Sequence, residues 1–221
     1  MKDFDAVVFD MDGVIFDSER ATLLCWLELA DQYGIQEMEK TYFACIGTNA
    51  AKTKQIMLDA YGEDFPCDAF FQEASHLYHE KYDGGRLPMK SGVHEILAFL
   101  KNKGKKIALA SSTRQQTVIN QLREAQILDY FEVVVTGDMV TKSKPEPDIF
   151  LLACEKAGVC PGRAYAIEDS FNGIRAAHRG GLKPIMVPDL LPANREMREL
   201  SEAVMDCLED VIEYWTEGEK I

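Results

Sequence analysis

Two aspartates lie two positions apart near the start of the chain, directly after a short apolar segment. The segment Ala6–Phe9 is rich in β-branched and aromatic residues and Gly13 follows it closely, a composition that predicts a buried parallel strand ending at Asp10. In an open α/β sheet, ligands bind where the strands give way to loops. Two carboxylates at such a place are costly to bury unless a cation or a proton offsets their charge. Asp10 and Asp12 therefore indicate chemistry on a bound group.

Three later apolar segments are also followed by polar residues that suit phosphate or a metal ion. Parallel strands end along one edge of a sheet, so we expect these side chains to meet Asp10 and Asp12 although they are far apart in sequence. They are Ser111 after the segment 106–110, Lys144 in the loop after 132–135, and Glu168 and Asp169 after 164–167.

The residue types at this edge favour phosphoryl transfer. Carboxylate oxygens suit Mg²⁺, which binds one or two carboxylates, water and substrate phosphate, and we expect Asp10 and Asp169 to hold it. The Ser111 hydroxyl and the Lys144 ammonium suit phosphate oxygens. Asp10 is the expected nucleophile, because a carboxylate can attack phosphorus and form an acyl phosphate. Asp12 can protonate the leaving oxygen and later deprotonate a water molecule.

Each signal has a structural alternative when it is taken alone. The stretch 10–13 is also typical of a turn with Asx hydrogen bonds, although an EF-hand loop is excluded because Ala21 stands where the twelfth-position glutamate belongs. The stretch 111–113 suits a helix N-cap, and 144–148 suits a rigid turn into a helix. Residues 168–170 suit an acidic first helical turn. Their occurrence in this order, each at a strand end, favours the catalytic interpretation.

The elements that would position these residues alternate along the second part of the chain. Strands separated by helices of about 10–15 residues predict right-handed βαβ units, and hence an α/β fold with a doubly wound parallel sheet. The expected strands are 4–10, 106–110, 132–135, 164–167 and 184–187, and the expected helices are 91–103, 114–125, 148–157, 170–179 and 205–215.

A helical block interrupts this alternation after the first strand. Apolar residues recur at helical spacing up to Tyr33, and further helices are expected over 50–61 and 68–81. We therefore expect a small all-α domain over 17–84, inserted into an α/β core formed by 1–16 and 85–221. Trp26 is expected in the core of the insert, and Gly84 with Gly85 is a candidate hinge.

Composition restricts the partners of the chain. The formal net charge of −13 over 221 residues argues against nucleic acid or an anionic membrane surface as partner, because the long-range field repels both. An anionic substrate would need a local cation, and Lys144 can supply it. The sequence contains no apolar run of about 18 residues and no signal-peptide pattern, so we expect a cytoplasmic protein. The six cysteines show no C-x-x-C spacing, and we expect them to be buried reduced thiols. For the oligomeric state, a monomer is the default expectation.

The four motifs together resemble those of the haloacid dehalogenase-like superfamily. Within it the chain is similar to the β-phosphoglucomutase-like and phosphoglycolate phosphatase-like enzymes with a helical cap, over essentially its whole length. The matching stretches are Asp10–Val14, Leu109–Ser112, Lys144–Phe150 and Ile167–Ser170.

This resemblance implies a role for each matching residue. Asp10 would be the nucleophile, Asp12 the acid/base, and Ser111 with Lys144 would hold the transferring phosphoryl group. Mg²⁺ would be bound by Asp10, the backbone carbonyl of Asp12 and Asp169, with Glu168 in or beside the metal shell. The core would be Rossmann-like, the insert would close over the site as a cap, and the substrate would be a small phosphorylated metabolite. Further candidates for substrate contact are Ser112, Arg114, Glu19, Thr22, Gly47, Thr48 and Asn49.

Departures from the sugar-phosphate mutase pattern favour hydrolysis. Thr22 stands where the mutase has a cap histidine, and Ala50 where it has a phosphate-gripping arginine. The Lys-Asn pair after the second motif is replaced by Arg114 and Gln115. A mutase must hold both phosphates of a bisphosphate, although Arg114 and Lys52 could compensate. A phosphomutase therefore stays as the alternative, and a non-catalytic binding protein on the same scaffold as a third.

Overall fold

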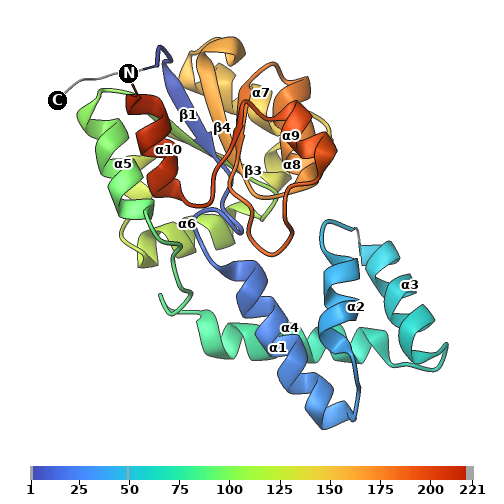
Figure 1. The fold of residues 1–221 in the computed structure, drawn as a ribbon. Coiled ribbons are helices and arrows are strands. Elements are labelled where there is room, and N and C mark those ends of the chain that lie inside the picture. Colours follow the sequence, from blue (N-terminus) through green and yellow to red (C-terminus); the bar gives the residue numbers. More distant parts are fainter. Residues whose placement is uncertain (1, 49, 218–221) are drawn as a thin grey trace. The chain divides into compact units, whose positions relative to one another are not determined.

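The computed structural model describes residues 2–48 and 50–217. The chain divides into two compact units, one formed by Met1–Asp17 with Pro88–Ile221 and the other by Ser18–Leu87 (Figure 1). The second unit is all-helical and occupies nearly the stretch 17–84 that the sequence predicts for an insert. Each unit has its own set of buried apolar side chains and hence its own core.

The first unit is built on a parallel sheet, which confirms the predicted α/β fold. Within the described residues the sheet has six strands in the order β3-β2-β1-β4-β5-β6, and every neighbouring pair is parallel. The order reverses between β1 and β4, the kind of place where open α/β sheets bind ligands. The strands are β1 Ala6–Phe9, β2 Lys106–Ser111, β3 Val133–Thr136, β4 Ala164–Glu168, β5 Lys183–Met186 and β6 Ala203–Val204.

Helices cover both faces of this sheet, as Figure 1 shows for the first unit. On one face, α7 (Asp148–Ala157) and α8 (Phe171–Arg179) pack on small strand residues such as Ala108 and Ala166. On the other face, the side chains of Phe4, Tyr165 and Trp215 meet at ring-centroid distances of 5.0 to 5.4 Å. The remaining helices of the unit are α5 Val93–Asn102, α6 Gln115–Glu124, α9 Arg195–Leu200 and α10 Leu208–Thr216.

The second unit is held together by an aromatic cluster around Trp26. The indole packs edge-on against Tyr42 and Phe70, at centroid distances of 5.0 and 5.4 Å, and is 8% exposed. It belongs to the core of the unit, as the sequence predicts. The helices are α1 Ser18–Tyr33, α2 Met38–Cys45, α3 Ala50–Tyr61 and α4 Cys67–Tyr82.

Two short α-helices and one short strand are absent from the sequence-based prediction. The helices α2 and α9 have eight and six residues, too short to be stable outside the packed protein. The strand β6 has two residues and exists through its pairing with β5. Local patterns carry little information about elements of this length.

The cysteine prediction is partly wrong. All six thiols are free, but Cys160 is exposed and Cys207 is half-buried, whereas the other four are buried. Cys160 lies in the loop that leads into a short 3₁₀ turn and Cys207 directly precedes α10, and loop residues commonly face solvent. In the described part of the chain, no helix combines the length and the apolar character that crossing a membrane requires.

Trp215 should carry much of the stability of the first unit. Its side chain is fully buried against Phe4, Tyr165 and Phe99. We expect Trp215→Ala to lower the free energy of unfolding by about 3–5 kcal/mol, measured by urea unfolding followed by circular dichroism. Trp215→Phe should cost less, because the indole Nε1 makes no hydrogen bond within the described residues. Glu213→Ala on the exposed side of α10 is the control, and an equal loss there would contradict this account.

Candidate active site

The site lies at the carboxyl ends of β1, β2 and β4, which are neighbours in the sheet. Asp10 directly follows β1, and its backbone N–H donates to the carbonyl of Ile167 in β4 at 2.9 Å. The parallel register places Phe9 beside Leu109 and Ile167, so Asp10 emerges between Ala110 and Glu168. The topology thus brings a residue near the amino terminus next to residues a hundred or more positions away.

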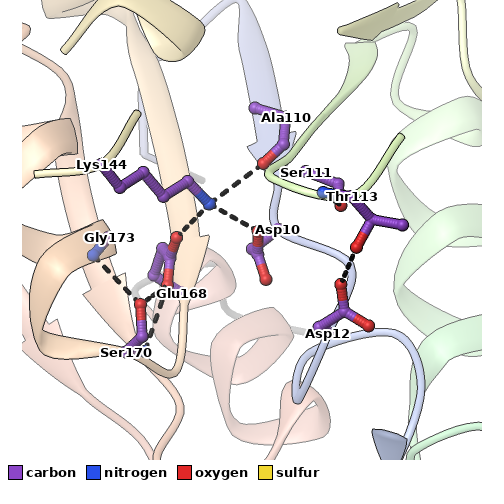
Figure 2. Close-up of polar contacts among 9 residues, drawn as sticks. All are labelled: Asp10, Asp12, Ala110, Ser111, Thr113, Lys144, Glu168, Ser170 and Gly173. Atoms are coloured by element: carbon purple, nitrogen blue, oxygen red, sulfur yellow. Dashed lines mark hydrogen bonds and ion pairs between the residues drawn. The ribbon is translucent and has the colours of Figure 1, made fainter. Parts of the chain in front are cut away.

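The Lys144 ammonium lies at the centre of the site (Figure 2). Its Nζ donates to Asp10 Oδ1 at 2.5 Å, to Glu168 Oε1 at 2.6 Å and to the carbonyl of Ala110 at 3.1 Å. The side chains of Lys144, Asp10 and Glu168 are 8%, 9% and 0% exposed. The ammonium therefore donates its three hydrogen bonds to groups at the carboxyl ends of β1, β2 and β4.

The far oxygen of Glu168 is held by the start of α8. Glu168 Oε2 accepts from the backbone N–H of Ser170 at 3.1 Å and from its hydroxyl at 2.9 Å. The Ser170 oxygen in turn accepts from the backbone N–H of Gly173 at 3.0 Å, which caps the helix. Both carboxylate oxygens of Glu168 thus have partners, so the buried side chain has a fixed orientation.

The second aspartate is contacted by the loop after β2. The Thr113 hydroxyl donates to Asp12 Oδ2 at 2.8 Å, and the Thr113 backbone N–H donates to the hydroxyl of Ser111 at 3.0 Å (Figure 2). Ser111 is fully buried at the end of β2. Asp12 and Ser111 are therefore linked through one intervening residue.

Three carboxyl groups of the site suit a cation. Asp10, Glu168 and Asp169 each offer an oxygen, and these oxygens all lie within 4.8 Å of one another. Gly13 has a φ of +79°, and a side chain there would overlap the carboxylate of Asp169. The donor set consists of hard oxygen ligands, which Mg²⁺ prefers over the nitrogen and sulfur ligands typical of zinc.

Burial makes the charged form of Asp10 costly. Removal from water raises the pKa of Asp10 to about 8, with further raising by Glu168 and Asp12 and an opposing effect of the Lys144 ammonium. The same carboxylates raise the pKa of Lys144 above its usual value, because they outweigh the cost of burying the ammonium. Lys144 therefore stays protonated, and one ammonium does not compensate the several carboxyl groups around it. A bound divalent cation would offset the remaining negative charge of these carboxyl groups.

The structure brings together most of the residues that the sequence singles out in the first unit. Asp10, Asp12, Ser111, Lys144, Glu168 and Asp169 all lie at this edge of the sheet. Ser112 and Arg114 are exposed in the loop between β2 and α6.

The remaining candidates lie in the helical unit. The Glu19 carboxylate accepts from the Tyr42 hydroxyl at 2.8 Å, and the Thr22 hydroxyl donates to the Ser18 carbonyl at 2.9 Å. The Thr48 hydroxyl donates to the carbonyl of Cys45 at 2.7 Å, beside the exposed Gly47. Asn49 lies outside the described residues. The contact of these residues with substrate remains a prediction.

Sequence reasoning missed Thr113 and Gly173. The Thr113 hydroxyl contacts a residue 101 positions away, so no local pattern indicates it. A Cβ added to Gly173 would overlap the Glu168 carboxylate, which shows that α8 approaches β4 closely there. The available signal was a glycine inside the first turns of a predicted helix, which is destabilising unless close packing requires it.

Comparison with known proteins agrees with this geometry. The model of the haloacid dehalogenase-like hydrolase family matches residues 7–187. A phosphorylated carbohydrates phosphatase of Thermotoga maritima is 33% identical, over 82% of this chain and 83% of that protein. A beta-phosphoglucomutase of Bacillus subtilis (strain 168) is 31% identical, over 98% of this chain and 99% of that protein. The crystal structure of CbbY from Rhodobacter sphaeroides in complex with phosphate has a TM-score of 0.73 and 25% sequence identity. The match covers 94% of this chain and 96% of that chain.

Gly173→Ala should disturb the site without touching Asp10. The added methyl group overlaps the Glu168 carboxylate, so either the carboxylate moves away from Lys144 or α8 moves away from β4. We expect a loss of about 1–3 kcal/mol in the free energy of unfolding, measured by urea unfolding. In Gly162→Ala, the new Cβ would have its nearest neighbour at 3.9 Å, so this control should change stability by less than about 1 kcal/mol. Equal stability of both variants would contradict the close packing of α8 on Glu168.

Proposed function

This chain belongs to the haloacid dehalogenase-like hydrolase family, and we propose that it is a Mg²⁺-dependent phosphatase acting on a small phosphomonoester through an aspartyl-phosphate intermediate. Like its relatives, the chain is an enzyme that acts on phosphate esters. The observation that carries the proposal is the buried contact of Lys144 with Asp10, beside the carboxylates of Glu168 and Asp169. A carboxylate nucleophile and a cation for phosphate oxygens are thus adjacent.

The first half of the proposed reaction transfers the phosphoryl group to the protein. An oxygen of Asp10 attacks phosphorus, and the bond between phosphorus and the ester oxygen breaks. Asp12 gives its proton to the departing oxygen, so that a neutral alcohol leaves. Lys144 and the Ser111 hydroxyl bind the phosphate oxygens and reduce the repulsion between the substrate and Asp10.

The second half returns Asp10 to its starting state. Asp12, now a carboxylate, takes a proton from a water molecule as that water attacks phosphorus. The bond between phosphorus and Asp10 breaks, inorganic phosphate leaves, and Asp12 again carries a proton. One ester and one water are consumed for each alcohol and phosphate released.

The residues suited to hold the metal ion are Asp10 and Asp169, with Glu168 beside them and the backbone carbonyl of Asp12 as a further oxygen. The fit rests on their chemistry, since three carboxylate oxygens lie within 4.8 Å of one another at a place where Lys144 leaves the negative charge undercompensated. When bound, Mg²⁺ supplies positive charge that favours the ionised nucleophile and the phosphate oxygens.

We propose that the helical unit Ser18–Leu87 is a cap that controls access and selects the substrate, a small phosphorylated metabolite. Both segments that connect it to the core are paired with each other: the backbone N–H of Asp17 donates to the Pro88 carbonyl at 2.9 Å, and Phe16 forms a β-bridge with Met89. Paired crossings allow the helices beyond them to move as one body. Exclusion of water by such a cap would favour transfer to Asp10.

A phosphomutase is the second candidate function. It is favoured by the 31% identity to a beta-phosphoglucomutase over 98% of this chain. Against it, Thr22 and Ala50 replace the histidine and arginine that the mutase pattern has in the cap. The two functions separate in one assay, because a mutase interconverts hexose phosphates when a sugar bisphosphate is supplied, whereas a phosphatase releases phosphate.

Asp10→Asn should abolish hydrolysis. The amide is a poor nucleophile, so we expect phosphate release from p-nitrophenyl phosphate and sugar phosphates with Mg²⁺ to fall at least about a thousandfold. Asp129 is exposed on the surface of the α/β unit. Asp129→Asn is therefore the matched control and should keep full activity. Residual activity above a tenth of the wild-type rate in Asp10→Asn would contradict an aspartyl-phosphate route.

Stabilisation by Mg²⁺ should depend on pH through Asp10. Without a cation the pKa of Asp10 in the folded protein is raised from 3.8 to about 8, so the contribution of its neutral form to stability is full below the ordinary value and is lost as pH rises from there through 8. Mg²⁺ binds the ionised form and reverses the loss. The Mg²⁺-induced rise in Tm should therefore be larger at about pH 9 than at about pH 5, and smaller in Asp10→Asn at both. An equal Mg²⁺-induced rise in Tm in Asp10→Asn and in the wild type at about pH 9 would contradict the assignment of Asp10 to the metal.

A further inference from the structure

Thr113 contacts two residues of the proposed catalytic set through two different atoms. Its hydroxyl donates to Asp12 Oδ2 at 2.8 Å, and its backbone N–H donates to the Ser111 hydroxyl at 3.0 Å (Figure 2). The residue is half-buried in the loop between β2 and α6. The contact with Asp12 depends on the side chain, whereas the contact with Ser111 does not, so a substitution can separate them.

The loop that carries Thr113 is fixed by the end of β3. The backbone N–H of Gly137 donates to the Thr113 carbonyl at 3.1 Å. A Cβ on Gly137 would overlap the carbonyl of Ser112, so β3 packs directly on this loop. Asp138 Oδ1 accepts from the Thr136 hydroxyl at 2.6 Å and from the backbone N–H of Gln115 at 3.1 Å, which ties the loop down on its far side.

A threonine in a fixed loop directs its hydroxyl more strictly than a longer side chain would. The two branches on its Cβ leave few rotamers, so the hydroxyl donor has a defined position. A hydrogen bond to one carboxylate oxygen limits rotation of the Asp12 carboxyl group. The other carboxyl oxygen of Asp12 then stays at a defined place relative to Asp10, because both aspartates belong to the loop that follows β1.

We propose that Thr113 is a positioning residue for Asp12, holding the acid/base group in the orientation that protonates the departing ester oxygen; this role rests on the proposed phosphatase function. The interaction acts on the step in which the phosphorus–oxygen bond of the ester breaks and the oxygen takes the proton of Asp12. An alkoxide needs that proton, whereas p-nitrophenolate is stable enough to leave without it. Misplacing Asp12 should therefore slow the hydrolysis of alkyl phosphate esters more than that of p-nitrophenyl phosphate.

The test compares kcat/KM for two esters, because this quantity reports the steps up to release of the alcohol and leaves out the later hydrolysis common to both. The esters are p-nitrophenyl phosphate and the best alkyl phosphate found in a panel of sugar phosphates, glycerol phosphate and phosphoglycolate. The main variant is Thr113→Val, which keeps the shape and the backbone N–H but removes the hydroxyl. Thr113→Ser restores a hydroxyl, and Thr117→Val, exposed on α6, is the matched control.

In Thr113→Val, we expect kcat/KM for the alkyl ester to fall about tenfold to a hundredfold and for p-nitrophenyl phosphate less than about threefold. Thr113→Ser should recover most of the alkyl activity, and Thr117→Val should match the wild type on both esters. Equal losses on the two esters, in an active wild-type background, would overturn the positioning role and leave the phosphatase proposal standing. A wild-type chain inactive on every ester would overturn both. If Thr113→Val does not fold, Thr113→Ala is compared in the same way.

Discussion

The buried ion pairs of Lys144 are the interaction on which the site depends. One ammonium donates to the carboxyl groups of Asp10 and Glu168 and to the carbonyl of Ala110, so it joins the ends of three neighbouring strands. Burying these groups is costly, and the cost is offset only if each one keeps its partners. These ion pairs therefore add little net free energy to folding. They do fix a carboxylate, a cation and a cluster of oxygens able to bind a metal ion at one edge of the sheet.

The fold supplies that place through its strand order. Because β1 lies between β2 and β4 and all are parallel, their carboxyl ends meet on one edge. Glycines then allow the surrounding elements to approach: Gly13 lies against Asp169, and Gly173 lies against Glu168. The acids are thus held by backbone approaching from two sides, which limits the movement of groups whose mutual repulsion would otherwise separate them.

Sequence predicted the residues whose signals are local. Asp10, Ser111 and Glu168 each close an apolar strand, so both their position and their shared edge follow from the parallel-sheet pattern. The contact of Thr113 with Asp12 depends on two loops that meet only in the folded protein. The helix α2 and the strand β6 are likewise products of packing, since neither is long enough to form by its own propensity.

The central claim is that Asp10, beside Lys144, receives the phosphoryl group. The most direct measurement is to mix the enzyme with Mg²⁺ and an excess of its best substrate, quench in acid within milliseconds, and map the modified peptide by mass spectrometry. The account predicts one phosphoryl group, labile to hydroxylamine as an acyl phosphate, on the peptide that contains Asp10. A phosphoryl group on any other residue, or turnover by an enzyme that is never phosphorylated at any quench time, would contradict it.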